Sequence, residues 1–260
     1  MYEEYLEFAV GLARQAGAIQ MESFRGGDLA IETKSNLYDV VTRVDKACET
    51  LIARSITERY PDHALLGEEG GLRGREDSEW RWVVDPLDGT TNYSQGLPLF
   101  TVSIALQHNG RPVVGVVYAP CVDELYSATL GGGAWLAERG RESRRIGVAR
   151  KEDLHTAVLV TGFPYDKETN ADNNLDNVTR ILTHIRGLRR MGSAAYDLCC
   201  VAAGWTDGFW ELALHEWDVA AGELIVTEAG GVVESLRDNR GVSIVAGNSR
   251  MVEAMRQYVR

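Results

Sequence analysis

The chain has 260 residues, of which 45% are hydrophobic and 25% are charged, a balance typical of a folded globular protein. This length can bury a large core and fits one large domain or two small ones. The formal net charge of −11 disfavours generic nucleic-acid binding, because phosphate backbones attract lysine and arginine. An acidic protein can still hold a phosphate group when a bound metal ion reverses the local charge.

The sequence indicates neither a secretory signal nor a membrane-spanning segment. Residues 1–5 include no basic stretch leading into an apolar one, and no apolar run is long enough to span a bilayer. The cysteines at 48, 121, 199 and 200 form no C-x-x-C pair and are interpreted as free thiols. These features predict a cytoplasmic protein with no membrane contact.

Hydrophobic spacing in the first half predicts an α+β arrangement. Apolar residues at three- and four-residue steps indicate a helix over residues 3–24. Thr42 and Asp45 form a capping-box pattern at the start of a second helix, and Asn109-Gly110 is typical of a hairpin turn. Strands are expected at 64–66, 80–84, 101–107, 112–119, 124–128 and 134–137.

In the second half the pattern of elements is different, because predicted strands alternate with predicted helices as in α/β proteins. Strands are expected at 157–161, 208–212, 232–235 and 242–246, and helices at 173–184, 194–203, 218–229 and 248–258. This change predicts an N-terminal α+β subdomain at residues 1–145 and a C-terminal α/β subdomain at residues 146–260.

The most informative stretch is Trp-Val-Val-Asp-Pro-Leu-Asp-Gly-Thr-Thr-Asn at residues 82–92. Asp85 and Asp88 follow an apolar strand and precede a predicted helix N-terminus, whose exposed N–H groups favour an anion such as phosphate. Two carboxylates beside that anion would repel it unless a cation lies between them. Oxygen ligands select magnesium, manganese or calcium rather than zinc. A turn with an aspartate helix cap explains each aspartate singly, but not the whole string.

Two further acidic segments flank predicted elements. Gly67-Glu68-Glu69-Gly70 follows a short apolar strand, and Glu216-Trp217-Asp218 opens a helix. In isolation, a solvated turn and an aspartate N-cap are the ordinary interpretations of these two segments.

Taken together and in chain order, these segments resemble the inositol monophosphatase family, which extends to fructose-1,6-bisphosphatases and nucleotide phosphatases. The matching motifs are Gly-Glu-Glu at 67–69, Asp-Pro-Leu-Asp-Gly-Thr-Thr-Asn at 85–92, Trp-Asp-Val-Ala-Ala-Gly at 217–222, the mobile first loop at 34–45, and Thr-Glu-Ala-Gly-Gly at 227–231. The resemblance implies a five-layer αβαβα sandwich, usually a homodimer. It also implies a magnesium-dependent, lithium-sensitive phosphomonoesterase.

The resemblance assigns a role to each matching residue. The implied metal ligands are Glu68, Asp85, the backbone carbonyl of Leu87, Asp88 and Asp218, which would hold two or three Mg²⁺ ions, with Mn²⁺ as a possible substitute. The implied catalytic residues are Glu68, Thr90 and Asp45. The implied substrate contacts are Gly89, Thr90, Thr91, Gly192, Ser193, Ala194, Glu211 and Asp218. A carboxylate such as Glu211 can accept hydrogen bonds from two neighbouring hydroxyls, which suits a polyol.

Four other residues carry two interpretations each. Lys34 either meets the substrate phosphate or is a solvated loop residue. Arg189 and Arg190 either touch a second phosphate or serve a subunit contact. His215 is interpreted as a structural or rim residue rather than a catalytic one.

The expected activity is hydrolysis of a small phosphorylated polyol by metal-activated water, without a covalent intermediate. Inositol monophosphate is the leading substrate, while fructose-1,6-bisphosphate, histidinol phosphate and the 2′-phosphate of NADP stay open. A haloacid-dehalogenase mechanism fits less well, because Asp85 and Asp88 are one residue further apart than its Asp-x-Asp pattern. The alternative of another class is an interaction protein in transcription or ribosome-related complexes. No direct nucleic-acid partner is expected.

Overall fold

The computed structural model describes residues 2–26 and 29–260, whose strands form sheets of eight, five and two strands. The helices are α1 (Glu3–Ser23), α2 (Arg43–Arg59), α3 (Thr90–Ser94), α4 (Leu175–Ile181), α5 (Ala194–Ala202), α6 (Glu216–Glu228) and α7 (Ser249–Met255), with 3₁₀ turns η1 (Leu154–Thr156) and η2 (Leu182–His184). The strands are β1 (Glu32–Thr33), β2 (Val40–Val41), β3 (Ala64–Gly67), β4 (Gly71–Arg73), β5 (Trp80–Asp88), β6 (Thr101–His108), β7 (Arg111–Ala119), β8 (Glu124–Thr129), β9 (Gly133–Glu138), β10 (Arg144–Arg145), β11 (Val158–Thr161), β12 (Gly187–Arg189), β13 (Gly208–Leu214), β14 (Val232–Arg237) and β15 (Val242–Gly247).

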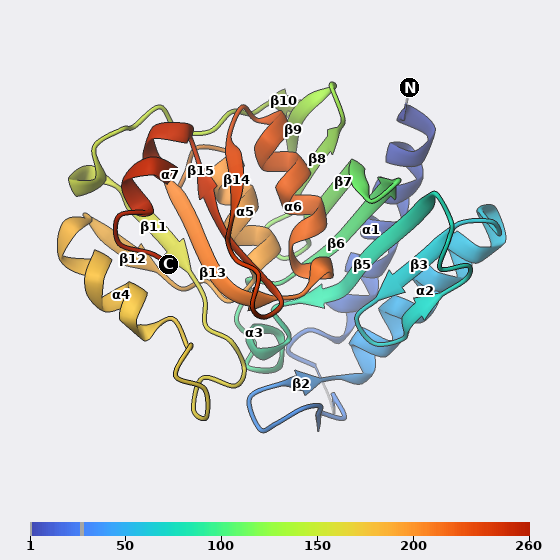
Figure 1. Ribbon diagram of the computed structural model, residues 1–260. Helices are drawn as coiled ribbons and strands as arrows, with labels where there is room; N and C mark the ends of the chain where they lie inside the picture. The colour runs from blue at the N-terminus through green and yellow to red at the C-terminus, as the bar shows by residue number, and fades with distance from the viewer. Residues whose placement is uncertain (1, 27–28) are drawn as a thin grey trace.

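The two large sheets and their helices form five layers. Helices α1 and α2 cover the outer face of the eight-stranded sheet, and α5 and α6 pack between the two large sheets (Figure 1). Helices α4 and α7 cover the outer face of the five-stranded sheet. This order confirms the αβαβα sandwich that the sequence resemblance implied.

Apolar side chains fill each space between layers. Leu12 of α1 and Ile52 of α2 pack with Trp82 on the outer face of the eight-stranded sheet. Leu198 of α5 and Ile225 of α6 belong to the core between the two sheets. Full burial of one such side chain stabilises the fold by about 1.5–3 kcal/mol. The middle layer is therefore held on both faces, which gives the helix N-termini within it fixed positions.

The order of strands brings one sheet edge to the candidate site. The eight-stranded sheet has the order β10-β9-β8-β7-β6-β5-β3-β4, and β3 runs parallel to β5. The carboxyl ends of two parallel strands meet at the same edge, so Glu68, just after β3, lies beside the end of β5. The backbone N–H of Glu68 donates to the carbonyl of Val84 at 3.2 Å.

Most predicted elements are confirmed. Helix α2 begins after Thr42, whose side chain caps it, and Asp45 completes the capping box. The hairpin between β6 and β7 turns at Asn109-Gly110, where both residues have positive φ. Helix α6 begins at Glu216, so Asp218 is its third residue rather than its N-cap. The aspartate N-cap interpretation is therefore wrong.

Other boundaries differ for physical reasons. Strand β5 continues to Asp88 instead of ending at residue 84, because it stays paired with β6 across a register shift between Asp85 and Asp88. The helix expected at 173–184 begins only at Leu175, because Asn174 before it has a left-handed backbone. Its last residues form the 3₁₀ turn η2. The division into subdomains at residue 145 stays a prediction. No helix of the described residues has the length and apolar character needed to cross a membrane.

Close packing of α6 on β7 leads to a stability prediction. A Cβ on Gly115 of β7 would lie 2.7 Å from the carbonyl oxygen of Ala221 in α6. Because this neighbour is backbone, Gly115→Ala is expected to lower the free energy of unfolding by about 1–3 kcal/mol in chemical denaturation. Gly11→Ala is the matched control, since within the described residues nothing lies within 4 Å of its Cβ position. Unchanged stability of Gly115→Ala would contradict this packing.

Candidate active site

The five predicted metal ligands line one cavity of about 150 Å³. Glu68 follows β3, Asp85 and Asp88 lie on β5 with Leu87 between them, and Asp218 lies in the first turn of α6. Gly89 and Thr90 line the same cavity, together with Lys34, Asp39, Tyr165, His215 and Trp217. The fold thus gathers acidic residues that are up to 150 positions apart in the chain.

Local backbone geometry directs the two aspartates of β5. The Leu87 N–H donates to Oδ1 of Asp85 at 2.9 Å, which fixes that carboxylate beside the bulged end of the strand. Gly89 then turns the chain into α3 with φ of 96°. A side chain at Gly89 would also lie 3.1 Å from the carbonyl oxygens of Leu99 and Gly192. Glycine is therefore required at this turn for both backbone conformation and space.

Asp88 connects the end of β5 to the N-terminus of α5. Its Oδ2 atom accepts hydrogen bonds from the Ser193 hydroxyl at 2.6 Å and from the Ala195 N–H at 2.8 Å. The Ser193 side chain also accepts from the Tyr196 N–H and so caps α5. Ser193, an implied substrate contact, is therefore also the N-cap of α5. The negative charge of Asp88 also lies favourably at a helix N-terminus.

Thr90 and Asp45, two of the implied catalytic residues, form a buried hydrogen-bonded pair. The Thr90 hydroxyl lies 2.9 Å from Oδ1 of Asp45 and 3.0 Å from the carbonyl of Leu87, and can donate to either oxygen. Oδ2 of Asp45 accepts from the N–H and the hydroxyl of Thr42. Because Asp45 is fully buried, removal from water raises the pKa of its carboxyl group. The capping box of α2 thus orients Asp45, and Oδ1 of Asp45 in turn orients the Thr90 hydroxyl at the cavity.

Lys34 contacts the acidic cluster directly. Its ammonium group donates to Oε1 of Glu68 at 2.7 Å and also pairs with Glu69. Burial lowers the pKa of Lys34, but the two carboxylates outweigh that effect and raise it overall. Lys34 is therefore not a solvated loop residue in this structure. The Glu69 N–H donates to buried Glu49 at 2.7 Å, which anchors the turn after β3.

Burial, with electrostatic repulsion added to it at Asp85 and Asp218, raises the pKa values of the carboxyl groups in the cavity. Burial raises the pKa of Asp85 well above its ordinary value, and the charges of Glu68, Asp88 and Asp218 raise it further. Removal from water and the charge of Asp88 likewise raise the pKa of Asp218. Removal from water also raises the pKa of Glu68 to about 7, although Lys34 opposes this shift. A bound cation would relieve these effects.

The donor atoms fit a hard divalent cation. Every predicted ligand offers a carboxylate or carbonyl oxygen, the type that magnesium and manganese prefer. In the described part of the chain, no three His, Cys, Asp or Glu side chains form a compact group that could hold a metal ion. The predicted ligands thus share a cavity without forming a coordination shell, and metal binding by them stays a prediction.

A second cavity of about 60 Å³ adjoins the first and shares Asp88 and Asp218 with it. Its lining includes the predicted substrate contacts Gly192, Ser193, Ala194 and Glu211. Removal from water raises the pKa of buried Glu211 to about 8, against the opposing charge of Arg190. Thr91 lies outside both cavities and lines a neighbouring one with Arg190. The structure therefore brings together all predicted substrate contacts except Thr91.

Several residues that line these cavities were not predicted from the sequence, among them Tyr165 and Asp197. Tyr165 lines both of them, and Asp197 lines the second. No local motif marks Tyr165, whereas Asp197 follows Ser193 by four residues on a predicted helix and so faces the same side. Arg190 also lines the second cavity, while Arg189 belongs to β12.

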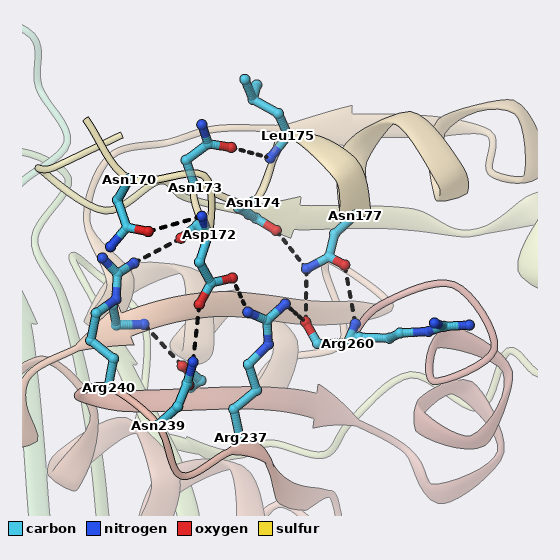
Figure 2. A network of polar contacts seen from close by, with 12 residues as sticks. Asn170, Asp172, Asn173, Asn174, Leu175, Asn177, Arg237, Asn239, Arg240 and Arg260 are labelled. Atoms are coloured by element: carbon cyan, nitrogen blue, oxygen red, sulfur yellow. Dashed lines mark hydrogen bonds and ion pairs between the residues drawn. The ribbon is translucent and has the colours of Figure 1, made fainter. Parts of the chain in front are cut away.

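A polar network holds the segment that carries Tyr165. Downstream of it, Asp172 pairs with Arg237 and accepts a hydrogen bond from Asn239 (Figure 2). Arg240 pairs with Asp166 and donates to the carbonyl of Asp172 at 2.8 Å. The turn between β14 and β15 thus anchors both ends of residues 166–172. These contacts keep the segment beside the two cavities.

Comparison with known proteins agrees with this geometry. A model of the inositol monophosphatase family matches residues 1–258. The Nus factor SuhB of Salmonella typhimurium is 42% identical over 254 residues, covering 96% of this chain and 93% of that protein. The inositol monophosphatase structure from Anabaena (Nostoc) has a TM-score of 0.86 at 37% identity, covering 99% of this chain and 95% of that one. The suhB structure from Bartonella henselae has a TM-score of 0.87 at 35% identity, covering 98% of each chain. This chain belongs to the inositol monophosphatase family.

Proposed function

We propose that the protein is a magnesium-dependent phosphomonoesterase that hydrolyses small phosphorylated polyols, with inositol monophosphate as the leading substrate. The observation that carries this proposal is the pair of adjoining cavities. One gathers the oxygen ligands expected for divalent cations, and the other carries Glu211 and the N-terminus of α5. Family membership supports phosphatase chemistry.

The acidic cavity divides into two groups of ligands in this proposal. Glu68, Asp85 and the carbonyl of Leu87 would hold one cation, while Asp85, Asp88 and Asp218 would hold a second. When bound, divalent cations supply positive charge that offsets the charge of the phosphate ester and activates the attacking water. Lys34 would leave Glu68 free for a cation by moving with its loop.

Thr90 and Asp45 would position the attacking water and accept its proton. The Thr90 hydroxyl can donate to Asp45, which leaves its oxygen lone pairs available to accept a hydrogen bond from water. The raised pKa of Asp45 makes its carboxylate a better proton acceptor. Backbone N–H groups of Gly89, Thr90 and Thr91 would bind the phosphate oxygens. No side chain needs to form a covalent intermediate.

The polyol would occupy the second cavity. Glu211 would accept hydrogen bonds from its hydroxyl groups, which favours a polyol over an aromatic or apolar leaving group. Fructose-1,6-bisphosphate, histidinol phosphate and NADP share the phosphate and differ in the group placed here. Phosphate release from a panel of these three compounds and inositol monophosphate distinguishes them.

A second candidate function is a role in transcription complexes, which the names of the Nus factor SuhB relatives favour. The same chain can carry both functions when its partner binds outside the two cavities. Copurification of RNA polymerase with a variant that releases no phosphate would demonstrate the partner role separately. Absence of direct nucleic-acid binding, the homodimer and the cytoplasmic location stay predictions.

Asp88→Asn tests the proposed cation site. The amide keeps an oxygen for the Ala195 N–H but loses the negative charge, so phosphate release with Mg²⁺ is expected to fall by about 100-fold or more. The thermal unfolding midpoint should change little. Asp77→Asn is the control, since Asp77 is exposed and pairs with Arg75, two residues away in the chain. Near-normal turnover of Asp88→Asn would refute the assignment.

Magnesium removal should have a pH-dependent effect on stability. In the folded state the pKa of Glu68 is about 7 and that of Glu211 about 8, both above the ordinary 4.5. The contribution of the two protonated carboxyl groups to the stability of the folded state is therefore complete below pH 4.5. It is lost as the pH rises through 7 and 8 and the groups ionise. In a chelator, the unfolding midpoint should fall across this window. Added Mg²⁺ should raise the midpoint more at about pH 8 than at about pH 5, because it binds ionised carboxylates. An equal rise at both pH values would contradict this account.

Lithium sensitivity provides an independent check. We expect Li⁺ to inhibit phosphate release in an uncompetitive manner by acting at one of the magnesium positions. Initial rates across substrate and Li⁺ concentrations measure this behaviour. Full activity in the presence of Li⁺ would indicate a second cation site that differs from the one proposed.

A further inference from the structure

One buried carboxyl group of the second cavity has no part in the mechanism proposed above. Asp197 lies in α5 and lines this cavity together with Glu211. Only 1% of its surface is exposed, and its Oδ1 atom has no hydrogen-bond partner among the described residues. Burying a polar atom without a partner destabilises a folded chain, so such atoms are uncommon in native proteins. Asp197 therefore carries an unsatisfied acceptor atom in a residue that lines this cavity.

The helix directs Asp197 toward the substrate side of the site. Ser193 caps α5 and donates to Asp88, and Asp197 follows four residues later. Residues four apart lie on the same helix face, so Asp197 is on the face that meets the cavity. Asp197 does not line the first cavity, where Glu68, Asp85 and Leu87 lie, although two of the proposed cation ligands, Asp88 and Asp218, line both cavities. Its position therefore suits the polyol rather than a cation.

Glu211 lies close to the backbone of Gly162, which also lines this cavity. A Cβ on Gly162 would lie 2.0 Å from Oε1 of Glu211, so the carboxylate rests directly over the glycine backbone. Both Gly162 and Asp197 line the same cavity as Glu211. Two carboxyl groups, carried by β13 and α5, thus border a single small space.

The chemistry of two carboxyl groups in one cavity suits neighbouring hydroxyls. Burial raises the pKa of Asp197, and the charges of Glu211 and Asp88 raise it further. A carboxyl group that holds a proton can donate one hydrogen bond and accept others, whereas an ionised one only accepts. Polyol hydroxyls both donate and accept, so they can satisfy both kinds of partner.

We propose that Asp197 is a specificity-determining residue that hydrogen-bonds a polyol hydroxyl beside the one bound by Glu211. This inference rests on the proposed phosphatase function and extends it to a residue outside the matching family motifs. It identifies the substrate as a polyol phosphate with at least two hydroxyls near the ester.

Asp197→Ala tests the proposal through substrate preference. KM is measured with Mg²⁺ for inositol monophosphate and for p-nitrophenyl phosphate, whose leaving group carries no other hydroxyl. The ratio of KM for inositol monophosphate to KM for p-nitrophenyl phosphate is expected to rise about tenfold. The variant loses a hydrogen bond that only the polyol substrate can form. Asp197→Asn should restore the ratio to within about threefold of wild type, since an amide both donates and accepts.

Asp207→Ala is the matched control for a buried aspartate. Asp207 is 5% exposed and accepts from the Lys151 ammonium at 2.8 Å and the Val158 N–H at 2.7 Å, outside both cavities. Its removal should lower the unfolding midpoint and leave the KM ratio unchanged. Asp197→Ala should raise the KM ratio and lower the midpoint less than Asp207→Ala does, because Oδ1 of Asp197 has no hydrogen-bond partner among the described residues.

The outcomes distinguish a failure of the proposed phosphatase function from a failure of the inference about Asp197. Wild-type protein that releases no phosphate from either substrate overturns the proposed function and this inference with it. Wild-type activity combined with an unchanged KM ratio in Asp197→Ala overturns the inference alone. A midpoint for Asp197→Ala as low as that of Asp207→Ala, without a selective change in KM, would show that the carboxyl is structural.

Discussion

Mutual repulsion among four carboxylates that share one cavity is the constraint on which the site depends. Burial raises the pKa values of Asp85 and Asp218, and the charges of Glu68 and Asp88 raise both values further. Such an arrangement is unfavourable for folding unless positive charge balances it. Lys34 supplies one positive charge in this structure. In the proposed function, the excess of negative charge that Lys34 leaves unbalanced gives the cavity its affinity for divalent cations.

The five-layer architecture holds these groups in place against their repulsion. The parallel pairing of β3 with β5 brings Glu68 to the end of the strand that carries Asp85. The helices between the two sheets supply the other contacts, since α6 carries Asp218 and the N-terminus of α5 binds Asp88. Packing on both faces of this middle layer therefore fixes the geometry of the site. The second cavity, bounded by α5 and β13, follows from the same packing.

Local sequence patterns predicted the long elements, because they bury one apolar face or end in a recognisable cap. The capping box at Thr42 and the Asn109-Gly110 turn are examples. The motifs likewise predicted which acidic residues share a cavity. Strands of two or three residues, such as β1 and β12, carry too little pattern to be predicted. Tyr165 and Asp197 were missed because only tertiary packing brings them to the cavities, and the contact of Lys34 with Glu68 depends on a loop conformation that no motif specifies.

Cation binding by the acidic cavity is the claim on which the proposed chemistry depends, and anomalous diffraction tests it most directly. Crystals of the protein grown with Mn²⁺ would be measured at the manganese absorption edge. The account predicts anomalous peaks within coordination distance of Asp85, Asp88 and Asp218, with Glu68 released from Lys34. A map with no peak in this cavity, while Lys34 still pairs with Glu68, would contradict it.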